Sequence, residues 1–414
     1  MLKLPTIKRV SSSALGYAIS FMLLIGLVAS GVLFISSANK RLERHHTMKE
    51  HLLMNNYFAL VHGSRSQSQG KQEIIHASGD TSKITRKDWG AFRVIVAETC
   101  HKVGSVKKSA IVGYETDNSH PALHLPERKQ TLKLCGETRI EGTAFLGERG
   151  AERGYIAGQS YKGDKLVYGK QKQSDRSLPG LKSSLKNETF QKYREDCIQI
   201  EPIAKDTSFS FSEQTRLVSM TDQLFLQNAI SGNVILHSFD TIVVKTNSSL
   251  ENVILIAPNV RFEDGFSGAV QVIAHESIRL GKDVKLNYPS ALILNEERKN
   301  ETSDRHGIFL EENAQVLGGV VLFSQFPNPR KPLLLQVEEA RIGGLVYNLG
   351  KTELKGEVIG YLYTNEFTLR AGGGQYTNHL LNAKISSDLL PKEMIVPNWL
   401  AKGKVTKPKL IACF

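Results

Sequence analysis

The sequence contains no charged residue between Arg9 and Lys40, and the run from Ala14 to Ile35 is almost wholly apolar. About 20 apolar residues suffice for a helix to cross a bilayer. A cleavable signal peptide has an apolar core of only about 7 to 15 residues, so an uncleaved anchor is favoured over cleavage near Ser37 and Ala38. We therefore predict a transmembrane helix at residues 14–37, with the lipid bilayer as its partner.

The basic residues at the two ends of this predicted helix nearly balance. Lys3, Lys8 and Arg9 precede it, and Lys40, Arg41 and Arg44 follow it. A short basic tail usually stays in the cytoplasm, so residues 1–13 are predicted to be cytoplasmic and the bulk of the chain extracytoplasmic, on the periplasmic side of an inner membrane. The reversed topology would place everything after Lys40 in the cytosol. Residues 38–56 are rich in helix formers and predict a helical stalk.

Cysteine is scarce, and the four cysteines have no CxxC spacing, which argues against a zinc site. Cys100 and Cys135 flank strand-like runs, so an exported chain favours a disulfide between them; buried thiols are the alternative. The sequence also lacks a Walker loop, GxSxG, HExxH and a dinucleotide fingerprint. No catalytic residue, cofactor or metal site is therefore predicted, although an enzyme is not excluded.

The composition, with 41% hydrophobic and 23% charged residues, is that of a folded globular chain. The formal net charge of +12 is spread over the whole length and comes with no cluster of aromatic and basic residues, so nucleic acid is not expected as a partner. A basic surface suits anionic envelope polymers or lipid headgroups. Lys402, Lys404, Lys407 and Lys409 make the C-terminal tail locally basic.

The remainder of the chain predicts a mainly β protein. Strand-like runs at Phe92–Glu98 and Ser109–Glu115 indicate a small β-rich unit at residues 57–130. Short apolar triplets between Gly-bearing turns predict a first β-helical segment at 131–175. A linker with a short helix follows at 176–205, then a β-helix at 206–372 and a C-terminal cap and tail at 373–414.

Within residues 206–372 the apolar runs repeat at roughly 19 residues, at the lower edge of the range for solenoids. Val234 to Val253 is one such step, and Val243 to Phe262 is another. Each rung exposes backbone groups that the next rung satisfies, so such units stack along one axis. We therefore predict a right-handed parallel β-helix.

Carboxylates, histidines and one arginine in this region are candidate catalytic groups, because β-helices host polysaccharide lyases and hydrolases that need such groups to converge. They do not share one rung position, and turn residues are the simpler interpretation. The candidates are Asp240, Asp264, His275, Glu276 and Asp283, with Asp304, Arg305 and His306 in the charged loop Leu294–Gly307.

Two further patterns carry little weight. His45 and His46 are adjacent, so on a helix they point apart and do not form a metal pair. Asn187, Asn247 and Asn300 lie in N-x-S/T sequons, which occur often by chance.

Several stretches resemble a family of Bacteroidota single-pass envelope proteins with a C-terminal β-helix. They are the basic tail and span, DWGAFRVIV, LCGETRIEG to LVYGK with SLPGL, and ELKGEVIGYLYTNEFTLR followed by YTNHLLNAKISSDLLP. The resemblance covers most of the chain, rests on structural motifs and implies a membrane-anchored β-helix without assigned catalytic residues. SSSALGYAISF is weakly similar to minor pilins, without the prepilin glutamate motif.

Three functions remain as hypotheses. The leading one is a membrane-anchored envelope scaffold or adhesion/assembly protein without catalytic activity, whose partner is an envelope polymer or a protein assembly. The alternatives are a β-helix carbohydrate-active enzyme and a pilin-like or secretion-system component. Small residues in the span favour helix packing in the membrane: Gly16, Ser20, Gly26, Ala29, Ser30 and Gly31.

Overall fold

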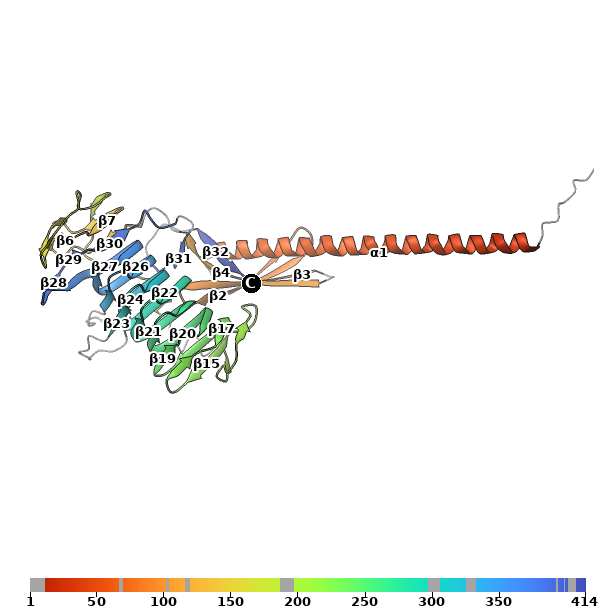
Figure 1. Ribbon diagram of the computed structural model, residues 1–414. Helices are drawn as coiled ribbons and strands as arrows, with labels where there is room; N and C mark the ends of the chain where they lie inside the picture. Colours follow the sequence, from red (N-terminus) through yellow and green to blue (C-terminus); the bar gives the residue numbers. More distant parts are fainter. Residues whose placement is uncertain are drawn as a thin grey trace, which may run out of the picture.

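The computed structural model describes residues 12–66, 70–101, 104–115, 120–186, 197–296, 306–324, 333–391, 394–397, 399–400 and 407–414. It has three parts: one long N-terminal helix, an antiparallel sheet, and a stack of mostly parallel strands (Figure 1). The predicted mainly β fold with one long apolar N-terminal helix is confirmed. Helix α1 spans Ser12–Arg65, so the predicted membrane helix and stalk are one continuous element.

The antiparallel sheet contains both early and late parts of the chain. Strands β1 (Gly70–Ile75), β2 (Thr81–Trp89), β3 (Phe92–His101) and β4 (Gly104–Glu115) pair in sequence order. The late strands β31 (Ile395–Val396) and β32 (Pro408–Cys413) both pair with β4. The chain therefore leaves this sheet after β4, builds the stack and returns to the same strand.

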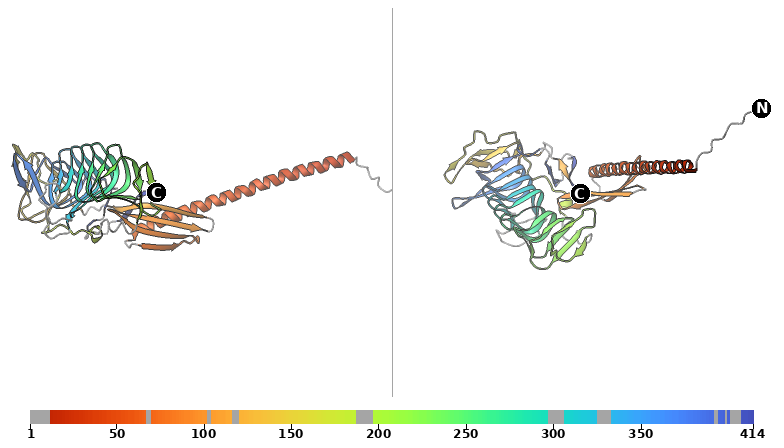
Figure 2. Two further views of the ribbon diagram at one scale, coloured as in Figure 1. Left: turned by 90° about the horizontal axis from the view of Figure 1, so that it is seen from below. Right: turned by 45° about the vertical axis from the view of Figure 1, so that its right-hand side comes forward.

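The stack, as we call the remaining closed sheet, is joined almost entirely by parallel pairing. Two views show its strands side by side in a row that lies across the end of the antiparallel sheet (Figure 2). Its longer strands are β20 (Ser249–Phe262), β21 (Ser267–Leu280), β22 (Lys285–Glu296), β24 (Gln315–Ser324), β26 (Arg341–Leu354) and β27 (Glu357–Ala371). Its shorter strands before β27 are β13 (Ile198–Ile200), β14 (Thr207–Phe209), β15 (Arg216–Met220), β16 (Leu224–Leu226), β17 (Ala229–Gly232), β18 (Val234–Ser238), β19 (Thr241–Val244), β23 (Gly307–Leu310) and β25 (Leu333–Gln336).

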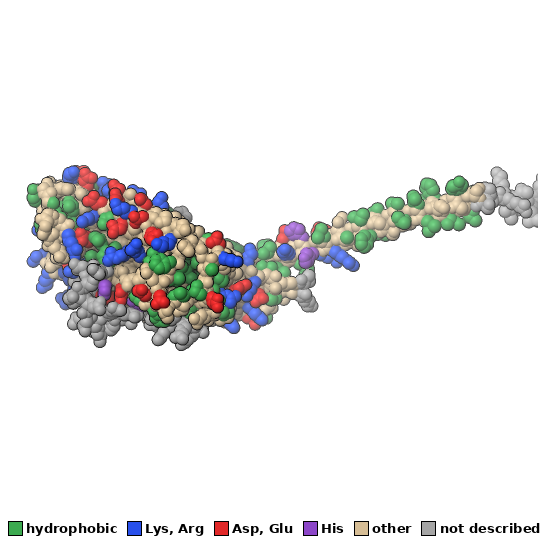
Figure 3. Space-filling view, turned by 60° about the horizontal axis from the view of Figure 1, so that its bottom comes forward, with side chains coloured by type: hydrophobic (Ala, Val, Ile, Leu, Met, Phe, Trp, Pro, Cys, Tyr) green, Lys and Arg blue, Asp and Glu red, His purple; other side chains and the backbone are tan. Residues whose placement is uncertain are grey.

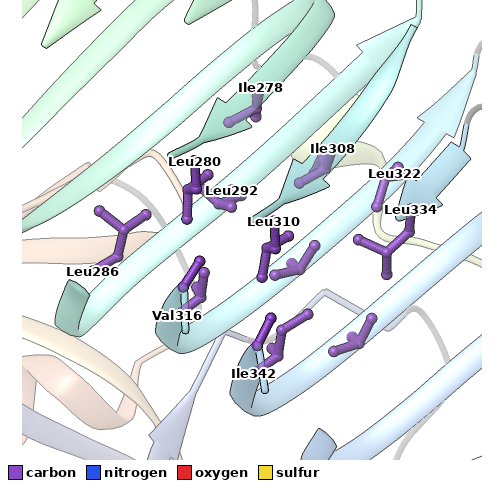
Figure 4. Packing of buried hydrophobic residues seen from close by; sticks show 14 of the residues in the cluster. Ile278, Leu280, Leu286, Leu292, Ile308, Leu310, Val316, Leu322, Leu334 and Ile342 are labelled. Atoms are coloured by element: carbon purple, nitrogen blue, oxygen red, sulfur yellow. The ribbon is translucent and has the colours of Figure 1, made fainter. Parts of the chain in front are cut away.

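In-register apolar rows hold the stack together from inside. Ile278 pairs with Ile308, which pairs with Leu334. Leu286, Val316 and Ile342 form a parallel row, and these side chains converge on the interior (Figure 4). All are buried. Because strand residues alternate between faces, each coil supplies both this interior and an outer surface.

The first and last coils of the stack come from distant parts of the chain. Strands β5 (Leu123–His124), β7 (Arg139–Glu141), β8 (Ala144–Leu146) and β12 (Gln171–Gln173) join the far end of the stack, where β5 pairs with β27 and β7 pairs with β30 (Lys384–Ser386). The predicted segments 131–175 and 206–372 therefore belong to one closed sheet, and they are connected through β5 and β30, which lie outside both ranges. Small additional strands are β6 (Leu132–Cys135), β9 (Ala151–Arg153), β10 (Tyr155–Ile156), β11 (Gln159–Ser160), β28 (Gly374–Thr377) and β29 (His379–Leu381).

The spacing of the coils departs from the predicted period. The register Ile235 to Ile254 agrees with a 19-residue step, but Phe262 pairs with Val244 rather than Val243. Steps also vary, because turns differ in length: Leu345 pairs with Tyr361, whereas Ser277 pairs with Gly307 across an insertion. The predicted linker contains α2 (Ser183–Lys186), but the short helix predicted at Lys186–Cys197 falls almost wholly on residues 187–196, which lie outside the described residues.

Candidate functional site: a sheet packed between the helix and the stack

Helix α1 carries a bare apolar half and a packed half. From residue 13 to residue 46 every residue is exposed, and the helix is long and apolar enough to cross a membrane. Figure 3 shows apolar side chains along this protruding part, followed by charged and histidine side chains near the body. Of the latter, His46 lies 3.5 Å from Glu50 in an exposed pair. The predicted apolar anchor is thus one uncovered surface outside the body.

The packed half of α1 covers one face of the antiparallel sheet. Ala59 and Leu60 are buried and pack in one cluster with Ile84, Ile95 and Val112 of the sheet. Gly63 lies against the sheet as well, since a Cβ there would come within 2.8 Å of the Ile84 side chain. Roughly 1.5–3 kcal/mol is expected from burying each large aliphatic side chain, so this face fixes the helix on the sheet.

Polar contacts set the position of the helix along the sheet. The buried Asn56 amide donates hydrogen bonds to the Ala97 carbonyl (2.8 Å), the Val106 carbonyl (3.0 Å) and the Thr99 hydroxyl (3.2 Å). Arg86 donates to the carbonyl of Gly63 near the C-terminal end of the helix (2.9 Å). Buried polar groups cost free energy when their partners are lost, so sliding the helix is penalised.

A second polar group closes the same interface at its edge. Asp80 accepts hydrogen bonds from Ser78 (2.8 Å) and Asn55 (2.6 Å) and pairs with His101. Burial raises the pKa of Asp80, but the hydrogen bonds from these partners outweigh it and hold the pKa below its usual value. The carboxylate therefore stays ionised while it links α1, the β1–β2 turn and β3.

The opposite face of the sheet packs on the outer surface of the stack. Trp89, Phe92, Val94 and Ile111 belong to one buried cluster with stack residues, including Ile254. Trp89 meets Phe211 edge to face, with ring centroids 5.3 Å apart. Because both faces of the sheet are buried against different partners, the sheet joins the helix to the stack.

One glutamine on the stack contacts the backbone of the β2–β3 turn. Gln271, which is buried, accepts a hydrogen bond from the Ala91 amide (2.6 Å) and donates one to the Trp89 carbonyl (3.1 Å). Gly90 between them has φ of 58°, and a Cβ there would lie 2.3 Å from the Gln271 Oε1 atom. Lys87 adds a bond to Thr215 of the stack (3.1 Å).

The returning C-terminal segment adds a third contact to this joint. Tyr288 on the stack donates a hydrogen bond to the Ile395 carbonyl of β31 (3.0 Å), and burial raises the pKa of its phenol. Trp399 is buried over Gly319, where an added Cβ would lie 2.5 Å from the indole ring. The sheet, the stack and the C-terminus thus form one continuous packed body.

The candidate catalytic residues that the structure describes are divided between at least two corners of the stack. Asp264 accepts the Lys282 backbone amide (2.9 Å), and Asp283 adopts the left-handed turn conformation. Asp240 accepts a hydrogen bond from the adjacent Thr241 hydroxyl (3.1 Å) in its turn. These three observations support the interpretation of the residues as turn residues.

His275 and Glu276 lie at the same corner of the stack as Asp240, because Thr241, Asn259 and Ser277 pair in register. Glu276 accepts a hydrogen bond from Asn259 (2.9 Å), His275 contacts the Asn295 carbonyl (3.3 Å), and His306 lies 3.9 Å from Glu296. Asp304 and Arg305 lie outside the described residues, as do Asn187, Asn300, Lys402 and Lys404. Within the described part of the chain no group of three His, Cys, Asp or Glu side chains is arranged to hold a metal.

The favoured disulfide is not formed. None of the four cysteines is in a disulfide: Cys100 is exposed on β3 of the antiparallel sheet, whereas Cys135 is buried on β6 at the far end of the stack. Burial raises the pKa of the Cys135 thiol. The two residues belong to different sheets, which the flanking strand-like runs do not reveal.

Sequence reasoning did not identify Asn56, Gln271 or Trp89, the residues that fix the joint. Each contacts a segment distant in sequence. A polar residue within an apolar run is the only local signal, and it applies to Asn56 and Gln271 but not to Trp89. The predicted span, by contrast, was visible in local composition.

Comparisons with known proteins add little. No family model matches the chain, and no curated protein matches it, so the resemblance to Bacteroidota envelope proteins stays a prediction. Among solved structures, the competence-associated pilin ComZ from Thermus thermophilus is similar over 100% of this chain and 99% of that chain, with 11% identity and a TM-score of 0.23. A TM-score this low supports no argument about fold or function.

Proposed function

We propose that this protein is a membrane-anchored scaffold of the cell envelope that holds a right-handed β-helix in a fixed orientation beyond the bilayer. The observation that carries the proposal is the two-faced sheet, with α1 packed on one face and the stack on the other. Parallel strands joined by crossovers in one sheet are almost always right-handed, which supports that hand for the stack.

The bare half of α1 supports anchoring in lipid. A helix that is apolar on all sides needs an apolar environment around it, and nothing else in the body covers residues 13–46. At about 1.5 Å per residue, the apolar run of roughly 25 residues exceeds the thickness of a bilayer core. The first residue of α1 that is buried in the body, Leu52, then lies a few helical turns beyond the apolar run.

The test is protease accessibility of a C-terminally tagged form, compared between cells with a permeabilised outer membrane and lysed cells. The proposal predicts a membrane-bound tag that is digested before the inner membrane is broken. Protection of the tag until the inner membrane is broken would reverse the topology, and recovery of the intact protein in the soluble fraction would overturn the anchor.

A pilin-like assembly subunit is the second candidate, and the surface of the bare helix favours it. Gly16, Gly26 and Gly31 have nothing within 4 Å of an added Cβ, and Gly16 and Gly26 each precede a serine by four residues. Small residues at this spacing let membrane helices pack closely. Helix contacts between copies in the membrane would be the first step of such an assembly.

Single cysteines in a background free of native cysteines test this candidate. Oxidative cross-linking of Gly26→Cys, without cross-linking of Val28→Cys on the opposite side of the helix, supports specific packing. Equal cross-linking at both positions, or none at either, argues for an isolated anchor.

A further inference from the structure

Four successive turns on one corner of the stack share the same form. Each has four residues, at 263–266, 281–284, 311–314 and 337–340, between one strand and the next. The third residue of each has positive φ, and the fourth is buried: the third residues are Gly265, Asp283, Asn313 and Glu339. These turns form a continuous ridge, which the next turn interrupts because it has only the two residues Lys355 and Gly356.

The short turn is stabilised by the interior of the stack. Gln336 takes the place of leucine in an interior row, where it pairs in register with Leu310 and Leu354. Its amide donates hydrogen bonds to the carbonyls of Ala340 (2.5 Å) and Glu357 (2.9 Å). A Cβ at Gly356 would come within 2.2 Å of the Ala340 carbonyl oxygen, so glycine lets the shortened turn lie against its neighbour.

A groove of about 570 Å³ lies at this interruption. Its lining is polar and charged, and the side chains come from five coils. The lining residues are Lys285, Asn313, Gln315, Glu339, Arg341, Lys355, Gly356, Glu357, Asn382 and Lys384. The groove therefore runs along the stack axis across several rungs.

The charges in the groove follow the rungs. Five residues of the lining pair in register on successive rungs, and every second one is a cation. They are Lys285, Gln315, Arg341, Glu357 and Lys384. Neighbouring strands are about 4.8 Å apart, so these cations recur at about 10 Å, close to the length of a disaccharide. Arg341 is 61% exposed although it pairs with Glu357 at 3.1 Å, so its guanidinium remains accessible.

We propose that this groove, here called the notch groove, binds a linear acidic polysaccharide that carries carboxylates. The cations on alternate rungs match a chain with spaced negative charges, and Arg341 suits carboxylates because its guanidinium forms paired hydrogen bonds. Asn313, Gln315 and Asn382 supply amides for sugar hydroxyls. Glu339 and Glu357 disfavour a chain with a phosphate on every unit, because the carboxylates repel it. The site goes beyond the scaffold function and does not depend on the membrane anchor.

The test uses the detergent-solubilised full-length protein and calorimetric titration with a hyaluronan oligosaccharide, which carries one carboxylate per disaccharide and is chosen long enough to span five rungs, roughly 20 Å. The triple variant Lys285→Gln, Arg341→Gln, Lys384→Gln removes the alternate cations. The matched control Lys133→Gln, Lys162→Gln, Lys172→Gln removes the same charge at the far end of the stack. We expect the groove variant to lose about tenfold or more in affinity and the control to bind like the wild type.

An uncharged oligosaccharide of equal length and a single-stranded oligonucleotide serve as comparison ligands. Weaker binding of both than of the hyaluronan oligosaccharide supports the proposal. Tighter binding of the oligonucleotide, equal binding of the uncharged sugar, equal loss in both triple variants, or no binding of the hyaluronan oligosaccharide at low salt would overturn it. Circular dichroism of the triple variants confirms that they are folded.

Discussion

The two halves of helix α1 have the same backbone conformation but opposite surroundings. Residues 13–46 are exposed on every side, whereas Leu52, Asn56, Ala59 and Leu60 are buried against the antiparallel sheet. The packed half obtains its apolar environment from its own chain. The bare half does not, so its environment must come from outside, and a bilayer or neighbouring helices provide one. One continuous helix therefore combines a segment that is long and apolar enough to cross a membrane with a segment that packs on the folded body.

The strongest way to break this comparison is to place charges in the bare half. Leu24→Arg together with Leu27→Arg should release the protein from membranes, because each central charge costs about 2.5–3.5 kcal/mol in a bilayer. Alkaline carbonate extraction measures the effect, and the melting temperature of the body should not change. Leu42→Arg, beyond the apolar run, is the control and should remain membrane-bound. A double variant that resists extraction like the wild type would contradict the assignment.

In the packed half, a core truncation should act on stability. Leu60→Ala removes a buried side chain (1% exposed) and should lower the free energy of unfolding by about 2–5 kcal/mol. Membrane association should persist. Met54→Ala, at a side chain that is 70% exposed, should change stability by less than about 0.5 kcal/mol. Thermal unfolding compares the two, and equal melting temperatures would show that this half does not pack on the sheet.

Acid should reduce the stability of the stack and of the helix–sheet unit over different pH ranges. Burial, with a smaller effect of His275, lowers the pKa of His237 to about 4. Its ring contacts the Ser219 hydroxyl (2.9 Å) and Phe239. The folded state favours neutral histidine, so stability is complete above the unfolded pKa of about 6.5 and falls as the pH drops towards 4, by at most about 3 kcal/mol.

His237→Gln should reduce this acid loss, while His46→Gln, at an exposed position, should not. Urea unfolding at pH 7 and pH 4.5 measures the difference. Because Asp80 in the helix–sheet unit also has a lowered pKa, it contributes its own loss of stability below about pH 4 in all three proteins. An identical pH dependence for wild type and His237→Gln would show that the buried imidazole does not control acid stability.

The smallest expected effect concerns the turn ridge. Glu339 has φ of 65°, where the equivalent residues are glycine, aspartate or asparagine. Asparagine tolerates this conformation better, so Glu339→Asn should stabilise the protein by about 0.5–1 kcal/mol. Glu338→Asn, one residue earlier, should not. A lower melting temperature for Glu339→Asn would indicate that the glutamate side chain stabilises the turn in a way that outweighs its backbone strain.

The sequence revealed features that local pattern encodes. The uncharged run before Lys40 identified the bare half of α1, and the spacing of Val234 and Val253 indicated the repeat. It did not show that β5 pairs with β27, because pairing between segments so far apart in sequence leaves no local period. The contact of Gln271 with Ala91 and the notch beside Gly356 likewise depend on tertiary neighbours. The placement of Cys100 and Cys135 in different sheets was not visible in the sequence for the same reason.

The central claim is that the sheet fixes the stack relative to helix α1. Pulsed electron–electron double resonance measures the distance between two spin labels and tests this claim directly. The labels are attached at Leu42→Cys on α1 and Glu312→Cys on the turn ridge, in a variant without the native cysteines that is placed in lipid nanodiscs. Both positions are well exposed, and neither lies in the joint. The account predicts one narrow distance distribution. A broad distribution would show that the stack moves freely on its anchor and would contradict the claim.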